Sequence, residues 1–143
     1  MLCLDVNVLV YAHRVDLPEH DQYAPLLTDW ANGSEPIGLP GVVLSGFLRL
    51  VTNRRVFVEP TPTAVAWDLV DRLVAARSTV QLQAGPRHWT HVRTLAHDID
   101  ARGSDIADAY VAAYALDNNA TLMSADRGFA RFSRVRWQHP LDR

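Results

Sequence analysis

The chain has 143 residues, of which 48% are hydrophobic and 21% charged, and its formal net charge is −2. A chain of this length is most simply one domain, residues 1–143, that buries a core without disulfides, and its small net charge gives no support for a surface that coats polyanions in general. All 14 basic residues are arginine, which excludes mechanisms that need a lysine, such as a P-loop or a Schiff base.

The chain shows no signal for a membrane or for secretion. No apolar stretch approaches the roughly 20 residues that a membrane helix needs, and no basic segment precedes the N-terminal apolar run. The single cysteine, Cys3, lies inside that run and is expected to be a small buried hydrophobic residue. We therefore expect a cytoplasmic protein with no membrane partner.

Short apolar runs and amphipathic segments alternate along the first half of the chain. Leu2 to Asp5 has the continuous apolar character of a short strand that is buried on both faces. After it we expect, in chain order, a helix over Val6 to about Arg14, a helix within Asp16 to Asn32 that is entered at Pro18-Glu19, a strand over Ile37 to Leu39, a helix over Val42 to Asn53 and a helix over Thr63 to Ala76.

The second half continues the same alternation. Pro86 near a first turn and Gly103 after a last turn are typical of the two ends of one helix, and Ser104 is a candidate N-cap of the next. We expect a strand over Thr79 to Leu82, a helix over Pro86 to Arg102, a helix over Asp105 to about Asn118, a strand over Thr121 to Ser124, a short helix around Phe129 to Phe132 and a strand over Val135 to Gln138. Strands that alternate with helices predict a three-layer α/β/α domain with a mostly parallel central sheet.

Four aspartates are expected at one end of this sheet. Asp5 ends the first strand, and Asp126 follows the Thr121–Ser124 strand by two residues. Asp105 and Asp108 lie three residues apart in the first turn of the preceding helix, so both lie on one helix face near the positive end of its dipole. Ligands of open α/β sheets bind beyond the carboxyl ends of the strands, and the four acids converge there if the two strands are neighbours.

Each acid also has an ordinary structural interpretation: Asp5 as a helix cap, Asp105 and Asp108 as first-turn acids, and Asp126 as a turn residue. If they cluster, their charges repel and raise one another's pKa. A divalent cation removes that conflict, and oxygen ligands favour Mg²⁺ or Mn²⁺. Asn7 can add a neutral oxygen or a hydrogen bond.

The order of these motifs resembles the PIN domain. Asp-x-Asn stands at the N-terminus, DIADAYVAAYA on a helix, and TLMSADRGF after it; FLRLVTNRRVF and FARFSRVRWQHPL extend the likeness over nearly the whole chain. Within that family the chain is similar to VapC-type toxin ribonucleases of type II toxin–antitoxin (VapBC) systems. The resemblance implies Asp5, Asp108 and Asp126 as catalytic acids, Asp105 as a further metal ligand, and Ser124 as a supporting residue.

One position departs from the family pattern. The helix after the second strand usually carries a glutamate, and here Gly46, preceded by Ser45, stands at the matching place. None of the chain's glutamates falls there, so the departure leaves open whether one or two ions bind. Asp105 is a possible substitute, and a site completed by bound RNA is another.

The resemblance implies metal-assisted hydrolysis of RNA phosphodiester bonds, in translation-related RNA. A guanidinium binds phosphate bidentately, which makes Arg49, Arg127 and Arg131 candidate RNA contacts, with a solvated surface residue as the alternative for each. The resemblance also implies a VapB-type antitoxin as partner and a homodimer or toxin–antitoxin hetero-oligomer.

Two other functions compete with a nuclease. A PIN-like module can bind RNA or protein without cleaving, and the missing glutamate keeps that alternative open. A haloacid-dehalogenase-type phosphatase would use Asp5 as a covalent nucleophile, but Asn7 in place of a second acid and the absence of lysine disfavour it. His88 and His91 also share one helix face, yet no third metal ligand follows at a recognisable spacing.

Overall fold

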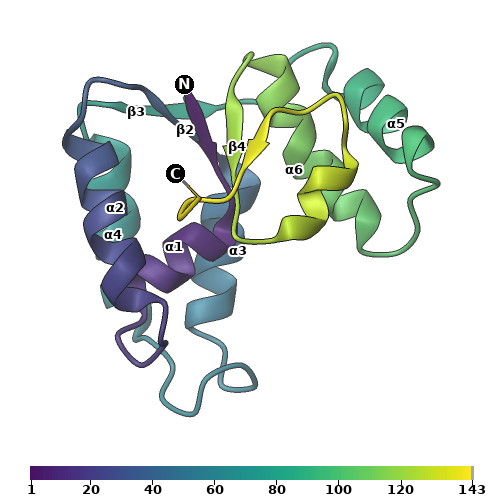
Figure 1. The fold of residues 1–143 in the computed structure, drawn as a ribbon. Helices are drawn as coiled ribbons and strands as arrows, with labels where there is room; N and C mark the ends of the chain where they lie inside the picture. Colours follow the sequence, from purple (N-terminus) through teal and green to yellow (C-terminus); the bar gives the residue numbers. More distant parts are fainter. Residues whose placement is uncertain (143) are drawn as a thin grey trace.

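A five-stranded parallel sheet runs through the centre of the computed structural model, which describes residues 1–142 (Figure 1). The strand order is β3-β2-β1-β4-β5, and every neighbouring pair is parallel. The strands are β1 (Leu2–Leu4), β2 (Ile37–Pro40), β3 (Thr79–Leu82), β4 (Thr121–Met123) and β5 (Trp137–Gln138). The parallel sheet predicted from the alternation of elements is confirmed.

Helices cover both faces of the sheet, which gives the predicted α/β/α layers. Helices α1 to α4 lie on one side and α5 and α6 on the other (Figure 1). The helices are α1 (Val6–His13), α2 (His20–Asn32), α3 (Gly41–Val51), α4 (Thr63–Ala75), α5 (His88–Asp98), α6 (Asp105–Asp117) and the 3₁₀ helix η1 (Arg127–Arg131).

The alternation of side chains along the central strands divides the core in two. Leu4 and Met123 pack into the core beneath α1 to α4, whereas Cys3 and Leu122 pack into the core beneath α5 and α6. Burial raises the pKa of the Cys3 thiol to about 12, so this residue behaves as the expected buried hydrophobic residue.

The predicted entry of α2 at Pro18-Glu19 agrees with the structure, in which the helix begins at His20 and Glu19 is its N-cap. The boundaries of α5 differ from the sequence prediction. Helix α5 runs over His88–Asp98 rather than Pro86 to Arg102. Its stop is Asp100, whose φ of 50° permits two closing bonds, from the Asp100 amide to the carbonyl of His97 and from the Ala101 amide to that of Ala96.

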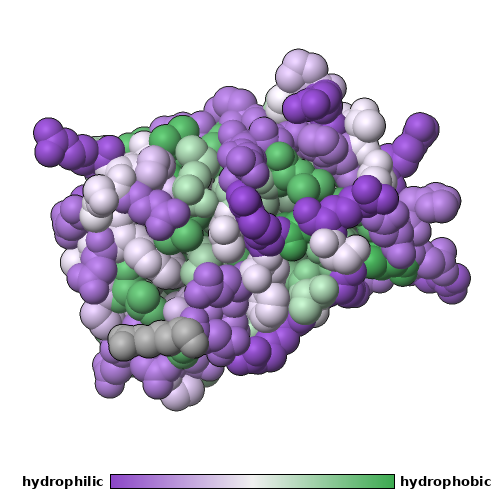
Figure 2. All heavy atoms as spheres, turned by 45° about the horizontal axis from the view of Figure 1, so that its top comes forward, coloured by the Kyte–Doolittle hydropathy of each residue, from purple (hydrophilic) through white to green (hydrophobic). Residues whose placement is uncertain are grey.

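The surface is mixed in character. In Figure 2, hydrophobic side chains lie in small groups between hydrophilic ones. Trp67 on α4 and Trp89 on α5 are exposed, so neither belongs to the core. Within residues 1–142, no helix combines the length and the apolar character that crossing a membrane demands.

Candidate active site

Asp5 lies where β1 ends and α1 begins. Its backbone is extended, so its carboxylate turns back and caps the helix: Oδ1 accepts a hydrogen bond of 2.7 Å from the Val6 amide. The structural interpretation of Asp5 as a helix cap is therefore confirmed, but it accounts for one of the two oxygens. Oδ2 lies toward β4, the strand that pairs directly with β1.

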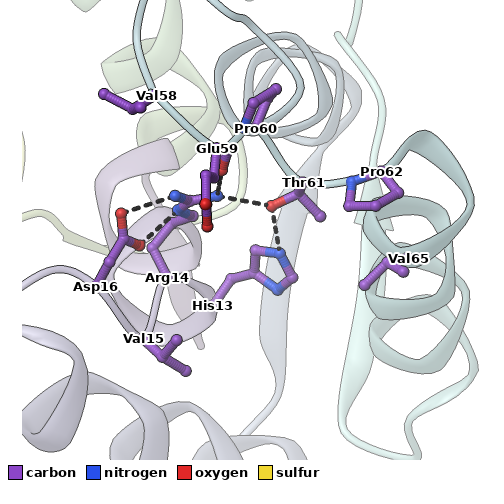
Figure 3. A pocket seen from close by; sticks show the side chains of 10 residues that line it. All are labelled: His13, Arg14, Val15, Asp16, Val58, Glu59, Pro60, Thr61, Pro62 and Val65. Atoms are coloured by element: carbon purple, nitrogen blue, oxygen red, sulfur yellow. Dashed lines mark hydrogen bonds and ion pairs between the residues drawn. The ribbon is translucent and has the colours of Figure 1, made fainter.

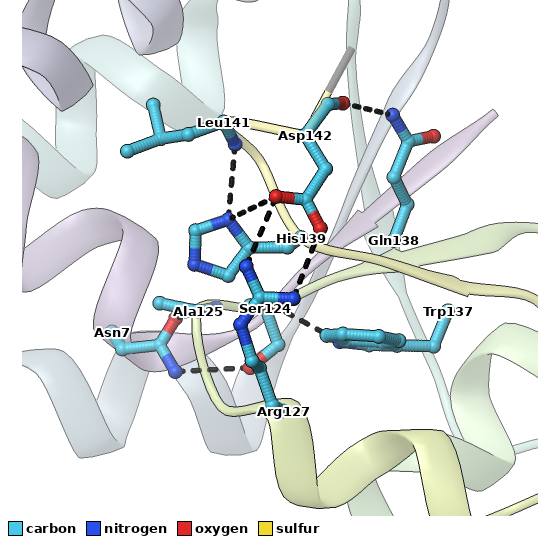
Figure 4. Close-up of polar contacts among 9 residues, drawn as sticks. All are labelled: Asn7, Ser124, Ala125, Arg127, Trp137, Gln138, His139, Leu141 and Asp142. Atoms are coloured by element: carbon cyan, nitrogen blue, oxygen red, sulfur yellow. Dashed lines mark hydrogen bonds and ion pairs between the residues drawn. The ribbon is translucent and has the colours of Figure 1, made fainter.

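A hydrogen-bonded network joins Asp5 to the end of β4. Figure 4 shows two of its members, Asn7 and Ser124, and the bond between them. The buried Ser124 hydroxyl donates to Asp5 Oδ2 at 2.6 Å and accepts from the Asn7 amide group and from the Asp126 backbone amide. Asn7 also donates to Asp5 Oδ2 at 2.9 Å, and its own oxygen accepts from the Ala125 amide. Each donor and acceptor of Ser124 is thus used, so this network fixes the position of the Asp5 carboxylate.

Asp105 and Asp108 occupy the first turn of α6, as their spacing predicts. Arg131 of η1 contacts both: its Nη1 lies 2.8 Å from Asp105 Oδ1 and its Nη2 lies 2.7 Å from Asp108 Oδ2. The Arg102 amide donates to Asp105 Oδ2, and this bond, together with Arg131, holds the pKa of Asp105 below its usual range. The pKa of Asp108 is raised instead, because partial burial and the charges of Asp126 and Asp105 outweigh Arg131.

Asp126 follows β4 and begins η1, where its Oδ1 accepts a hydrogen bond of 2.7 Å from the Gly128 amide. The turn interpretation of Asp126 is therefore also confirmed. Its charge nevertheless reaches the other acids: burial raises the pKa of Asp5, and the charges of Asp108 and Asp126 raise it further. The structure thus brings Asp5, Asp108 and Asp126 to one edge of the sheet as mutually repelling carboxylates.

A cavity of about 570 Å³ opens beside Asp5 and Asp108, between α3 and α6, and Asp126 lies outside its lining. Asp5 and Asp108 line it together with Gly46, Arg49 and Phe129. A Cβ atom added at Gly46 would meet Val6 at 3.5 Å, which is ordinary van der Waals contact. The position that carries glutamate in the family pattern therefore lines the same cavity as Asp5 and Asp108, and the local packing has room for a Cβ atom.

The donor set suits a hard divalent cation, because every candidate ligand is an oxygen. Its present geometry is more open than a finished site: within residues 1–142, no three His, Cys, Asp or Glu side chains converge closely enough to hold an ion together. The chemistry of the site fits Mg²⁺ or Mn²⁺, whereas binding by three carboxylates requires side chains to move.

The three candidate RNA-contacting arginines have different surroundings. Arg49 lines the cavity between α3 and α6. Arg127 makes a two-pronged ion pair with Asp142 near the C-terminus, with distances of 3.0 and 3.1 Å (Figure 4). Arg131 is engaged by the acids themselves. The sequence indicated a phosphate ligand at all three positions and missed the carboxylate partners of the last two.

The histidine pair on α5 has a structural partner that the sequence did not reveal. Nδ1 of the buried His88 lies 2.6 Å from Asp117 Oδ2, and Nδ1 of His91 lies 2.8 Å from Asp117 Oδ1. Asp117 ends α6, whose last turn packs against the first turn of α5. The sequence signal for this acidic partner is the three-residue spacing of His88 and His91 on one helix, followed directly by a second helix that can pack against it.

A second cavity, of about 560 Å³, lies at the far end of α1 (Figure 3). The buried Arg14 makes a two-pronged ion pair there with Asp16 and donates to the Glu59 carbonyl and the Thr61 hydroxyl. Its guanidinium also stacks over Phe57, 4.0 Å from the ring centre. Arg14 thus anchors the loop between α3 and α4.

Comparison with known proteins now identifies the family. The sequence profile of the PIN domain family matches residues 2–135, a span that contains all four aspartates of the candidate site. The chain belongs to the PIN domain family.

The similarity to individual members narrows this assignment. Ribonuclease VapC43 of Mycobacterium tuberculosis is 64% identical over 142 residues, covering 99% of this chain and 97% of that protein. Ribonuclease VapC31 of the same organism is 40% identical over 140 residues, covering 98% and 99%. The solved complex VapBC2 from Rickettsia felis, bound to a DNA fragment from its promoter, shares the fold with a TM-score of 0.71 at 18% identity over 96% of each chain. The chain is a VapC-type member of the family, which confirms the resemblance stated above.

Proposed function

We propose that this protein is a Mg²⁺- or Mn²⁺-dependent endoribonuclease whose catalytic acids are Asp5, Asp108 and Asp126. The observation that supports it is the pairing of β1 with β4, because the carboxyl ends of these neighbouring strands bring Asp5 and Asp126 to the edge where α6 begins. The chain's similarity to VapC ribonucleases supports RNA as the substrate.

Some side chains of the site orient the catalytic acids, and others are candidates to bind the metal ion or the RNA. Ser124 and Asn7 orient the Asp5 carboxylate, and Asp105 supports Asp108 as a further candidate ligand. A divalent ion held here would supply a water of lowered pKa and would offset the charge that develops on the phosphate. Arg49 lines the same cavity and is suited to bind an RNA phosphate beside the acids.

The proposal extends to the biological setting. The enzyme is a toxin that cleaves translation-related RNA in the cytoplasm, and a VapB-type antitoxin neutralises it in a hetero-oligomer. The similarity to the VapBC2 fold and to VapC relatives supports such a partner.

A second candidate function is RNA binding without cleavage. Gly46 at the glutamate position and the open arrangement of the carboxylates favour it. Cleavage of structured RNA with and without Mn²⁺ separates the two functions.

The matched variants for this experiment are Asp108→Asn and Asp21→Asn, since both remove an acid from the first turn of a helix and Asp21 is not part of the cavity that Asp5 and Asp108 line. The nuclease proposal requires metal-dependent cleavage by the wild type and by Asp21→Asn, and its loss in Asp108→Asn. RNA binding with no cleavage by any of the proteins at any Mn²⁺ concentration would establish the binding module instead.

A further inference from the structure

The position of Arg131 stands out among the arginines that follow Asp126. Arg127 pairs with Asp142 and Arg134 with Asp98, and neither partner is a candidate catalytic acid. Arg131 instead places its two terminal nitrogens on Asp105 and Asp108, at 2.8 and 2.7 Å. Within residues 1–142, Arg131 is the one cationic side chain that forms an ion pair with any of the four acids Asp5, Asp105, Asp108 and Asp126.

The geometry of this contact is specific to a guanidinium. The three-residue spacing presents Asp105 and Asp108 on one helix face, and the two ends of the planar fork reach one carboxylate each. The Arg131 side chain also lies over the Phe132 ring, 5.2 Å from its centre, and remains 36% exposed. The Arg131 guanidinium thus packs against the Phe132 ring and remains accessible to solvent.

The contact also bears on the open geometry of the site. Asp5 is immobilised by Val6, Asn7 and Ser124, so convergence of the carboxylates depends on the acids that are less constrained. One oxygen of Asp108 is occupied by Arg131, and no three acids converge within the described residues. A guanidinium carries one positive charge, whereas the ion that the site would take carries two.

We propose that Arg131 is an internal counter-ion that competes with the divalent cation for Asp108, so that an ion binds as the guanidinium leaves this carboxylate. The inference rests on the proposed metal dependence and adds a regulatory residue to it. Arg131 acts through Asp108 and is a positioning residue, with no direct part in the chemistry assigned to it.

Calorimetric titration of the full chain with MnCl₂ tests the proposal without an activity measurement. Arg131→Gln removes the competitor, and we expect it to bind Mn²⁺ about fivefold to tenfold more tightly than the wild type. Arg131→Lys keeps the charge but loses the two-pronged geometry, and we expect an intermediate gain. Circular dichroism and thermal unfolding in EDTA establish that each variant is folded.

Arg127→Gln is the matched control for long-range charge, because it removes a cation adjacent to Asp126 whose partner is Asp142. Its Mn²⁺ affinity is expected to equal that of the wild type. Equal gains in Arg127→Gln and Arg131→Gln would mean that general charge sets the affinity, and equal or weaker binding by Arg131→Gln would exclude competition; either result overturns the inference.

The outcomes also separate this inference from the proposed function. Mn²⁺ binding by the wild type with no gain in Arg131→Gln refutes the inference alone. Absence of Mn²⁺ binding in every variant refutes the metal dependence, and the inference with it. Binding by Arg131→Gln with none measurable in the wild type supports both.

Discussion

The two ends of α6 carry aspartates in opposite situations. At its start, Asp108 is 32% exposed, lies beside other carboxylates and has one oxygen engaged by Arg131. At its end, Asp117 is 10% exposed and has both oxygens engaged by His88 and His91. The helix dipole favours an acid at the start and disfavours one at the end, so Asp117 depends on its donors. Both oxygens of Asp117 are thus committed to contacts within the fold, whereas Asp108 has one oxygen paired with Arg131 and is repelled by neighbouring carboxylates.

The largest expected effect is on activity at the start of the helix. Asp108→Asn is expected to lower RNA cleavage at least about 100-fold, because the neutral amide no longer provides a charged ligand. The thermal midpoint should fall little, since the Asp108 carboxylate is already disfavoured by burial. Quantified cleavage beside thermal unfolding measures both, and full activity of a rigorously purified variant would remove Asp108 from the catalytic set.

The opposite pattern is expected at the end of the helix. Asp117→Ala leaves the buried His88 ring without its partner, which is expected to reduce the free energy of unfolding by about 1–3 kcal/mol. Asp98→Ala is the control, because it removes an α5 acid whose pair with Arg134 is more exposed, and a smaller loss than in Asp117→Ala is expected. Urea unfolding provides both values. Equal losses in the two variants would contradict the distinction drawn between the ends of α6.

Restoring a carboxylate next to the cluster sharpens the comparison. Gly46→Glu adds an acid beside Asp5 and Asp108 at a position that accepts a Cβ atom, and we expect Mn²⁺ to bind about tenfold more tightly. Gly41→Glu changes the same residue type at the start of the same helix and is the control. Thermal unfolding in EDTA is measured for both variants, because the added carboxylate of Gly46→Glu is repelled by its neighbours until a cation binds. Calorimetric titration that shows no difference between them would exclude position 46 from the site.

The smallest expected effect is the pH dependence of stability. Burial raises the pKa of Asp5 above its ordinary value of 3.8, so the folded state binds a proton at this carboxyl more readily than the unfolded state does. The contribution of Asp5 is therefore most favourable below pH 3.8 and declines as the pH rises through the folded-state pKa.

Asp5→Asn removes this decline. In EDTA, the stability of the wild type relative to Asp5→Asn is expected to fall as the pH rises above 3.8 and to level off once the pH has passed the folded-state pKa of Asp5. Unfolding free energies measured across this range test the sign. A wild type that gains on the variant with rising pH would show that the Ser124 and Val6 bonds, which lower the pKa, dominate over burial.

Much of the candidate site follows from local pattern. The apolar run before Asp5 places this acid at the end of a strand, and the periodicity after Ser104 places Asp108 in a first helical turn. The end of α5 was predicted less well, because the left-handed backbone of Asp100 closes this helix before Gly103 is reached.

The sequence by itself determined which segments are strands and helices and where the acids stand along them, because periodic burial and helix caps act over a few neighbouring residues. The tertiary structure alone decided that β1 lies beside β4, that Asp117 meets two histidines, and that Arg131 pairs with acids 23 and 26 residues away. These contacts depend on how whole elements pack against one another. Many different partners satisfy the same local pattern, and the packing selects one of them.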